Sequence, residues 1–286
     1  MTTQCSPEIS GLRRRLHERG GLLGLFVIVP RIEVVETAAA AGFDLVVLDC
    51  EHGPFGIEAV APLVAAAHGV GIHVMVRVAG HEPQAIGAVL DSGVDGVIMP
   101  HVESGEDARR VVSAARFPPS GDRSVHLSVR AAGYSSDPDY VRTADASVAV
   151  LAMVEGADAH TRLDEITAVA GIDGIFVGPM DLAASLGLPS SPWDSRVTAA
   201  ARDIVGRAQR AGRVTSIFAP TPDAAQSWLA SGVHMVALSV DAFLMRQGFE
   251  AAVTAARHKA SYVPPTIPSR SHRTNGESCP TPPPPG

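Results

Sequence analysis

FDLVVLDCEHGPF, residues 43–55, decides the expected fold. Its first half is almost continuously apolar and does not alternate between apolar and polar residues. Strands that are buried on both faces have this pattern, because helices then cover both sides of the sheet. Asp49, Glu51 and His52 follow within four positions at the carboxyl end of the strand. The stretch therefore predicts a buried strand that ends in a polar loop, either on the plain surface or at the rim of an active site.

Further short apolar runs of the same kind alternate with Ala-rich helical segments, many of which end in Gly, a usual signal for a helix C-terminus. Eight strands with helices between them, in about 240 residues, predict an α/β fold, a (β/α)₈ TIM barrel, as a single domain over residues 1–260. A doubly wound open sheet is the alternative, but its G-x-G-x-x-G fingerprint does not follow the first strand. The other expected strands are 22–29, 73–78, 96–102, 149–155, 174–178, 214–219 and 235–240.

Three segments depart from this rhythm. Residues 117–145 form a long excursion, and a loop of this length in a compact domain is usually functional or interfacial. Residues 242–260 predict a long last helix that closes the barrel or packs on another subunit. Residues 261–286 are rich in Pro and polar residues and bury too little apolar surface to offset their ordering entropy, so we expect a disordered tail.

Composition excludes several classes of protein. The net charge is −7, and no Lys/Arg block interleaves with aromatic residues, so we expect no nucleic-acid partner. Cys5, Cys50 and Cys279 are too far apart and too few for a disulfide framework, which favours a reduced, cytoplasmic setting. Residues 12–30 resemble a signal peptide in having charges followed by an apolar run. Charged residues follow this run directly and no small-residue cleavage site follows it, so we expect a first helix and a first strand there. No apolar run reaches the roughly 18–20 residues of a membrane span.

The active site of a (β/α)₈ enzyme lies at the carboxyl ends of its strands. The polar residues that the expected strands place there gather on the second to sixth strands, so one rim carries most of the charge. His101 and Glu103 are expected to begin the next helix or its loop and receive little functional weight. The full set at the strand ends is Asp49, Glu51, His52, Arg77, His101, Glu103, Glu155, Asp181 and Asp241.

Glu155 and Asp181 are the candidate metal ligands. Glu155 ends an apolar strand, where a carboxylate is costly unless it is paired or metal-bound. Asp181 begins a helix after Gly178, where it could also act as a cap or first-turn acid. A salt-bridged glutamate and a capping aspartate are therefore the structural alternatives. Together, the two carboxylates on adjacent strands suit Mg²⁺ or Mn²⁺, with water and a chelating substrate as the remaining ligands.

Arg77 and His52 are the candidate catalytic side chains. An Arg that points into a barrel mouth meets an anion, either a substrate oxyanion or a neighbouring Asp49 or Glu51. Histidine is the side chain type that titrates near neutral pH, so His52 is a candidate general base, with a solvated loop histidine as the alternative. Gly178-Pro179-Met180 leads into a helix whose first N–H groups could bind a carboxylate.

Several blocks resemble the HpcH/HpaI family of class II 2-oxo-acid aldolases over about residues 11–258. They are LDCEHGPF, VMVRV followed by LDSGVDGVIMPHV, AARFPPSGDRS, and MVEG with LDEITAVAGIDGIFVGPMDLAASLG. The resemblance implies a (β/α)₈ barrel, usually a homohexamer. It also implies a lyase that reversibly joins pyruvate or a similar 2-oxo acid to an aldehyde with Mg²⁺, Mn²⁺ or Co²⁺.

The resemblance also implies roles for individual residues. Glu155 and Asp181 would be the metal ligands, His52 the base and Arg77 the transition-state stabiliser. Asp91 would raise the basicity of the histidine, although the barrel pattern alone places it at a helix end, away from the rim. Asp49 joins the catalytic set. The substrate would be bound by Gly178, Pro179, Met180 and Met153.

Two departures from the family pattern bear on the substrate. Met153 stands where well-known members have a substrate-binding Gln, and Ser124 replaces a Gly. The resemblance therefore does not predict which aldehyde is the acceptor. A Schiff-base mechanism is not expected, because Lys259 lies after the last strand. The alternatives are a citryl- or malyl-CoA type lyase, a 2-oxo-acid decarboxylase on the same site, and a non-catalytic barrel.

Overall fold

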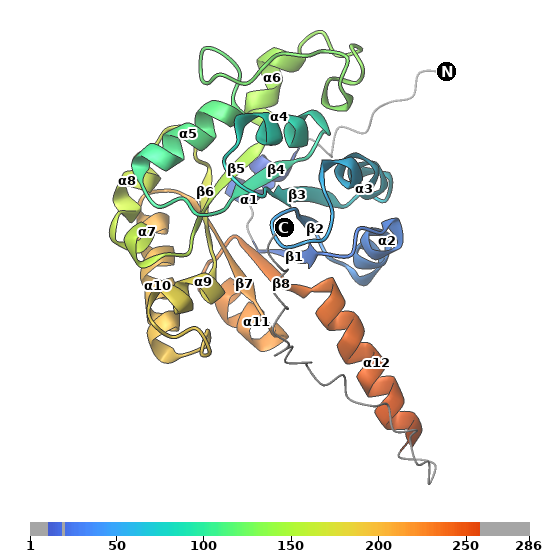
Figure 1. The fold of residues 1–286 in the computed structure, drawn as a ribbon, viewed down its shortest axis with the longest axis vertical. Coiled ribbons are helices and arrows are strands. Elements are labelled where there is room, and N and C mark those ends of the chain that lie inside the picture. The colour runs from blue at the N-terminus through green and yellow to red at the C-terminus, as the bar shows by residue number, and fades with distance from the viewer. Residues whose placement is uncertain (1–10, 19–20, 258–286) are drawn as a thin grey trace, which may run out of the picture. The chain divides into compact units, whose positions relative to one another are not determined.

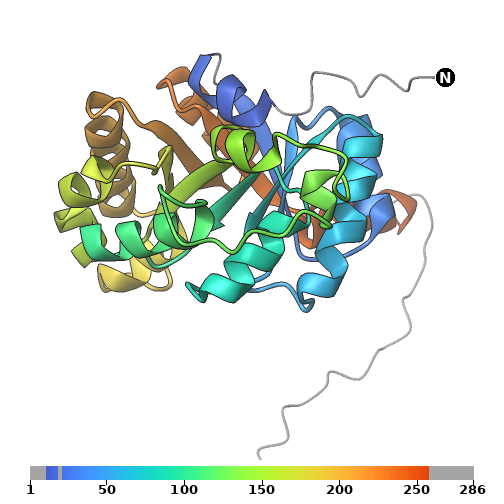
Figure 2. The ribbon, with the colours of Figure 1, turned by 90° about the horizontal axis from the view of Figure 1, so that it is seen from above.

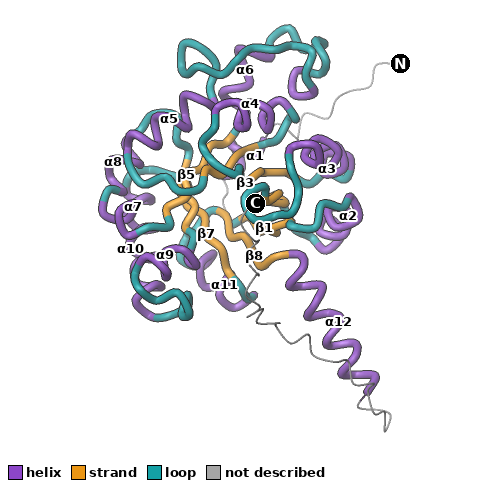
Figure 3. Tube along the Cα trace, viewed as in Figure 1, coloured by secondary structure: helices purple, strands orange, loops and turns teal. Residues whose placement is uncertain are grey.

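The computed structural model describes residues 11–18 and 21–257, in which eight parallel strands close into a barrel in the order β1 to β8. Figures 1 and 3 show the helices arranged around these strands. The predicted (β/α)₈ barrel is confirmed, and every strand lies within its expected range. The strands are β1 (Leu22–Val27), β2 (Leu45–Asp49), β3 (His73–Arg77), β4 (Gly96–Met99), β5 (Ala149–Val154), β6 (Gly174–Val177), β7 (Val214–Ala219) and β8 (Met235–Val240).

The chain divides into two compact units, Met1–Arg246 and Gln247–Gly286. The expected domain boundary at residue 260 and the expected tail lie outside the described residues. None of the described helices is long and apolar enough to cross a membrane. The helices are α1 (Leu12–Glu18), α2 (Ile32–Ala41), α3 (Ile57–Gly69), α4 (Pro83–Asp91), α5 (Gly105–Ala115), α6 (Tyr140–Ser147), α7 (Ala157–Thr161), α8 (Leu163–Ala168), α9 (Pro179–Ser185), α10 (Ser195–Arg210), α11 (Pro222–Ala230) and α12 (Asp241–Arg257), with a 3₁₀ turn at Arg130–Ala132.

Alternating residues of each strand build two cores. One set, which includes Val47, Met75 and Leu151, fills the inside of the barrel, and the other set packs against the surrounding helices. This explains why the strands read as continuously apolar, since both of their faces are buried. Leu12 and Leu16 of α1 are fully buried in the inner cluster, so α1 covers one end of the barrel (Figure 2).

The same end of the barrel carries a fourfold repeat. The residue before each even-numbered strand accepts a hydrogen bond from the second backbone N–H of the preceding odd-numbered strand, which ties neighbouring strands together where they begin. Each acceptor lies two residues after a glycine in the left-handed region that ends the previous helix. The pairs are Leu23 with Asp44 at 3.0 Å, Val74 with Asp95 at 2.8 Å, Val150 with Asp173 at 2.8 Å, and Thr215 with the His234 ring at 3.1 Å.

Two expected elements differ from the structure. β4 ends at Met99 and not at residue 102, because Pro100 has no N–H and His101 has a φ of +51°. The excursion at 117–145 contains part of α6 and a small core of its own, in which the Arg123 guanidinium lies 4.5 Å from the centre of the Phe117 ring. It is therefore an ordered layer on the barrel and not an open loop.

Candidate active site

Two adjacent cavities at the carboxyl ends of the strands bring most of the predicted residues together. They share Met153 and Asp181, which identifies them as parts of one site. The second cavity, of about 270 Å³, also includes Glu155 and His101. The first, of about 160 Å³, is lined by the predicted residues Asp49, His52, Arg77, Met153, Gly178, Pro179, Met180 and Asp181, together with Phe26, Phe176, Phe218 and Val240.

Arg77 and Asp49 form a buried, two-pronged ion pair between β3 and β2. Nε and Nη2 of Arg77 lie 2.9 and 2.6 Å from the two carboxylate oxygens of Asp49. Nε also lies 3.2 Å from Oε2 of Glu51. The expected alternative, an ion pair with these acids, is thus present, and because Arg77 also lines the cavity, the pair holds the guanidinium at the cavity wall.

The charge of Arg77 is secured by its neighbours. Burial alone would lower the pKa of Arg77, but hydrogen bonds to Asp49 and the charges of Asp49, Glu51 and Glu155 raise it above its ordinary value. The guanidinium also lies 5.0 Å from the centre of the Phe26 ring. Arg77 is therefore a fixed cation at the cavity wall, the kind of group that stabilises a developing oxyanion.

His52 lies on the turn that follows β2 and is more than half exposed. Oδ1 of Asp49 accepts the backbone N–H groups of Glu51 and His52, each at 3.2 Å, which fixes this turn. Gly53 completes it, because a Cβ at this position would collide with the carbonyl oxygen of Asp49. Asp49 therefore positions both His52 and Arg77, which answers why a buried strand runs into a polar loop.

Glu155 follows β5 and is almost completely buried. Burial raises the pKa of its carboxyl group, and the charges of Asp181 and Glu51 raise it further, while a hydrogen bond from His101 opposes them. Gly178 makes room for this carboxylate, since a Cβ there would lie 2.7 Å from Oε2 of Glu155. The site thus concentrates negative charge that a cation would neutralise.

The donor set of Glu155 and Asp181 fits a hard divalent ion. Both carboxylates line the same cavity, Asp181 is open to solvent, and their mutual repulsion is the condition that a bound cation relieves. Within the described residues, no group of three or more His, Cys, Asp or Glu side chains is arranged as a ready-made metal cage. Two protein ligands would leave coordination positions for a chelating substrate and water.

His101 belongs to the site, although the sequence pattern assigned it little weight. Its backbone N–H donates to Oε1 of Glu155 at 2.8 Å, and its Nδ1 lies 3.1 Å from the same oxygen. Its Nε2 lies 2.9 Å from Oε1 of Glu51. The left-handed backbone at this position folds the ring back over the acids. A histidine directly after a Pro at a strand end was the available signal.

Asp91 and Asp241 lie outside the site. Asp91 ends α4, and its carboxylate accepts from Nη2 of Arg123 at 2.6 Å in a separate cavity. Asp241 is buried and accepts the N–H groups of Ile28 and Val29, which joins the end of β1 to α12. Asp91 and His52 of one chain therefore line different cavities, and Asp241 has a structural role.

Comparison with known proteins identifies the family to which the chain belongs. The family model described as HpcH/HpaI aldolase/citrate lyase matches residues 22–248. A pyruvate aldolase of Rhizobium etli is 35% identical, with 85% of this chain and 96% of that protein covered. A 2-keto-3-deoxy-L-rhamnonate aldolase of Escherichia coli is 37% identical, with 81% and 87% covered.

A solved structure gives the same result. The crystal structure of a family protein from Burkholderia cenocepacia is 32% identical, has a TM-score of 0.83, and covers 87% of this chain and 99% of its own. The match of the family model extends over nearly the whole barrel and includes both candidate metal ligands. This chain belongs to the HpcH/HpaI aldolase/citrate lyase family.

Proposed function

We propose that this protein is a carbon–carbon lyase, a class II aldolase that cleaves and forms 4-hydroxy-2-oxo acids from pyruvate or a similar 2-oxo acid and an aldehyde. The observation that carries the proposal is a fixed cation, Arg77, and a histidine on the rim, His52, in one cavity with Asp181. The cavity of about 160 Å³ is smaller than the roughly 300–1,000 Å³ of pockets for drug-sized ligands, which suits a small oxo acid.

Glu155 and Asp181 would hold the divalent ion, Mg²⁺, Mn²⁺ or Co²⁺. When bound, such an ion supplies Lewis-acid polarisation of the substrate carbonyl. The buried carboxylate of Glu155 and the exposed one of Asp181, which line one cavity, would be its protein ligands. Met153 and Pro179 supply the apolar walls that keep water from the reacting carbons.

In the cleavage direction, His52 removes the proton of the C4 hydroxyl, directly or through one water. The bond between C3 and C4 then breaks and the aldehyde leaves. The electron pair of the broken bond forms the enolate of the 2-oxo acid. Arg77 stabilises the oxyanion as its charge develops, a contribution whose loss typically lowers the rate about 10²–10³-fold. A proton added at C3 gives the free 2-oxo acid. The N–H groups of Met180 and Asp181, beyond Pro179, would hold its carboxylate.

We also propose a cytoplasmic homo-oligomer, a hexamer by family resemblance, with small-molecule substrates and no nucleic-acid or membrane partner. Asp91 lies in a cavity that does not include His52 of its own chain. If Asp91 tunes a catalytic histidine, that histidine belongs to another copy in the oligomer. Loss of activity in Asp91→Asn without any change in metal affinity would support this route.

The test needs no knowledge of the aldehyde. The protein is incubated with pyruvate in D₂O with Mg²⁺, with Mn²⁺ and with EDTA, and exchange of the methyl protons is followed by NMR after removal of paramagnetic ion. We expect metal-dependent exchange that is lost in Glu155→Ala and Asp181→Asn. It should be kept in Asp139→Asn, which changes an exposed acid that lines neither cavity of the site. No exchange with any ion would reject the proposal and turn attention to CoA thioesters and other oxo acids.

A further inference from the structure

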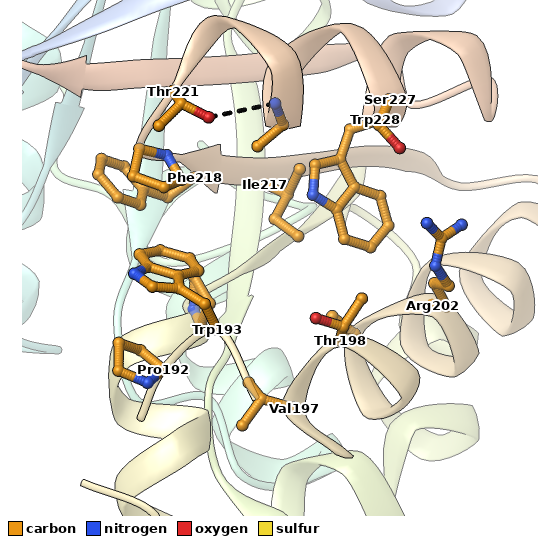
Figure 4. Close-up of a pocket in the computed structure, with 14 residues that line it drawn as sticks. Pro192, Trp193, Val197, Thr198, Arg202, Ile217, Phe218, Thr221, Ser227 and Trp228 are labelled. Carbon is orange, nitrogen blue, oxygen red and sulfur yellow. Dashed lines mark hydrogen bonds between the residues drawn. The ribbon is translucent and has the colours of Figure 1, made fainter. Parts of the chain in front are cut away.

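A further cavity lies beside the catalytic one and has no role in the chemistry described above. Its volume is about 420 Å³, compared with 160 Å³ for the cavity that contains Arg77. It lies between α10 and α11, on the outer side of β7, under the segment that leads into α10 (Figure 4). A volume in this range is typical of a site for a small organic ligand.

The lining of this cavity is apolar and aromatic. The chain has two tryptophans, and both line it. Figure 4 shows Trp193, before α10, and Trp228 of α11 on two sides of the cavity, with Ile217 of β7 between them. The guanidinium of Arg202 lies 5.2 Å from the centre of the Trp228 ring and covers it from the α10 side.

An aromatic surface connects this cavity to the catalytic one. Phe218 and Pro179 line both cavities. The ring of Phe218 stacks with that of Trp193, with centroids 6.3 Å apart and planes 29° apart. On its other side Phe218 lies 6.1 Å from Phe26, the ring over which the Arg77 guanidinium is placed. A molecule that reacts beside Arg77 can therefore extend across Phe218 without leaving an apolar surface.

Packing of the barrel does not explain Trp193. It is 49% exposed, and Phe218 of β7, on which it stacks, is only partly buried, whereas the next β7 residue, Ile217, is fully buried. A large apolar side chain that is held half-open at the edge of a cavity is typical of a binding surface.

The geometry points to an aryl group at the end of a short chain on the acceptor aldehyde as the occupant, so that this enzyme prefers 4-hydroxy-2-oxo acids whose C4 substituent ends in an aromatic ring. The inference rests on the proposed aldolase function. The carbonyl carbon of the aldehyde lies in the catalytic cavity, a short chain crosses Phe218, and the flat ring at its end lies in the space between the two indoles. Offset stacking and burial of apolar surface would hold the ring.

A polyhydroxylated aldehyde fits this lining less well. The hydroxyl of Thr221 accepts the N–H of Ala224, as Figure 4 shows. Thr198, Arg202 and Ser227 are the other polar side chains in the lining, and the remaining ten lining residues are apolar. Hydroxyl groups buried without partners weaken binding, whereas a ring requires none. The cavity therefore selects for aryl acceptors and against sugar-derived ones.

The first experiment compares kcat/KM for addition of pyruvate to 3-phenylpropanal and to glycolaldehyde, in wild type, Trp193→Ala and Trp228→Ala. We expect 3-phenylpropanal to be preferred by about tenfold or more, and both variants to lose about tenfold for 3-phenylpropanal, as is usual for apolar pockets. Glycolaldehyde rates should stay within about twofold, because it does not reach the indoles. Tyr134→Ala removes an exposed aromatic ring elsewhere and should change neither rate.

The second experiment measures binding directly and does not depend on turnover. In Trp193→Phe and Trp228→Phe the remaining tryptophan reports on the cavity, and benzyl alcohol, which cannot react, is titrated with fluorescence as the readout. Saturable changes in both variants support the inference. If pyruvate exchanges its methyl protons normally but 3-phenylpropanal is not preferred and benzyl alcohol does not bind, the inference is rejected while the aldolase function stands. If exchange itself is absent, the function is rejected first.

Discussion

Both carboxylate oxygens of Asp49 bind the guanidinium of Arg77, at 2.9 and 2.6 Å, inside the barrel mouth. The pair joins β2 to β3, and the same carboxylate also fixes the turn that carries His52. One buried side chain thus sets the positions of the fixed cation and the candidate base. The site therefore depends on Asp49 even though Asp49 need not touch the substrate.

Asp49→Asn should lower both stability and activity. The change keeps the shape but leaves the buried Arg77 with Glu51 as its remaining acid, which should cost about 1.5–3 kcal/mol of the free energy of unfolding, the range for hydrogen bonds to charged groups. Urea unfolding measures this cost. The matched control is Asp139→Asn, which removes the acid from the exposed pair with Arg142 and should have no measurable effect. Equal stability of the two variants would contradict the role assigned to Asp49.

Glu155→Gln should stabilise the metal-free protein at pH 8. Burial and neighbouring acids raise the pKa of Glu155 in the folded state. The folded protein then binds this proton more tightly than the unfolded chain, so the carboxylate opposes folding above its raised pKa, and the effect vanishes as the pH falls. Thermal unfolding without metal should show a variant equal to or more stable than wild type at pH 8, with no difference at pH 4.

The same variant should lose stabilisation by metal. A ligand at 100 times its dissociation constant stabilises the folded state by about 2.7 kcal/mol. Mn²⁺ should therefore raise the Tm of wild type and leave that of Glu155→Gln unchanged. A variant that is less stable than wild type without metal, or that is still stabilised by Mn²⁺, would show that Glu155 is a structural ion-pair partner and not a ligand.

The fold and most of the site could be predicted because their signals are local. Continuous apolar runs mark strands buried on both faces, and residues such as Asp49, Arg77 and Glu155 directly follow such runs. The barrel then places all strand ends at one rim, so a linear list of strand-end residues becomes a spatial cluster.

His101 and Asp91 could not be assigned in this way. The position of His101 depends on a left-handed backbone turn after Pro100, and the contact with Glu155 joins residues 54 positions apart. Asp91 was included by family resemblance, but its neighbour is Arg123 from the excursion, and pattern reasoning placed no structure there. Both cases depend on backbone that is neither helix nor strand.

The fourfold repeat at the other end of the barrel is visible in the sequence, although the strand and helix patterns alone do not predict its hydrogen bonds. A glycine, one apolar residue and an acceptor precede each even-numbered strand, as AGFD, SGVD, AGID and SGVH. The physical reason is that a left-handed glycine ends the helix and returns the chain to the next strand, with the acceptor facing the previous one.

Asp95→Asn should reveal the contribution of this repeat through pH. Burial would raise the pKa of Asp95, but hydrogen bonds with His68 and the N–H of Val74, together with the His73 ring 3.6 Å away, bring it below its ordinary value of 3.8. A lowered folded pKa gives stability that is present above the unfolded value and is lost as the pH falls through the folded one. The variant should be less stable than wild type at pH 7, with the gap closing only below about pH 4. A gap independent of pH would contradict the assignment.

His101→Ala and His101→Gly should separate the ring from the backbone. Both remove the imidazole that contacts Glu155 and Glu51, and loss of a partner of a metal-binding carboxylate typically costs about 10–100-fold in metal affinity. Calorimetric titration with Mn²⁺ should therefore show a similar loss in both. The left-handed backbone at this position costs residues other than glycine about 1–2 kcal/mol of folding free energy. His101→Gly should therefore unfold at a higher urea concentration than His101→Ala. Tighter Mn²⁺ binding in both variants would instead identify His101 as a cation that competes with the metal, and equal stability would show that the backbone at this position is not strained.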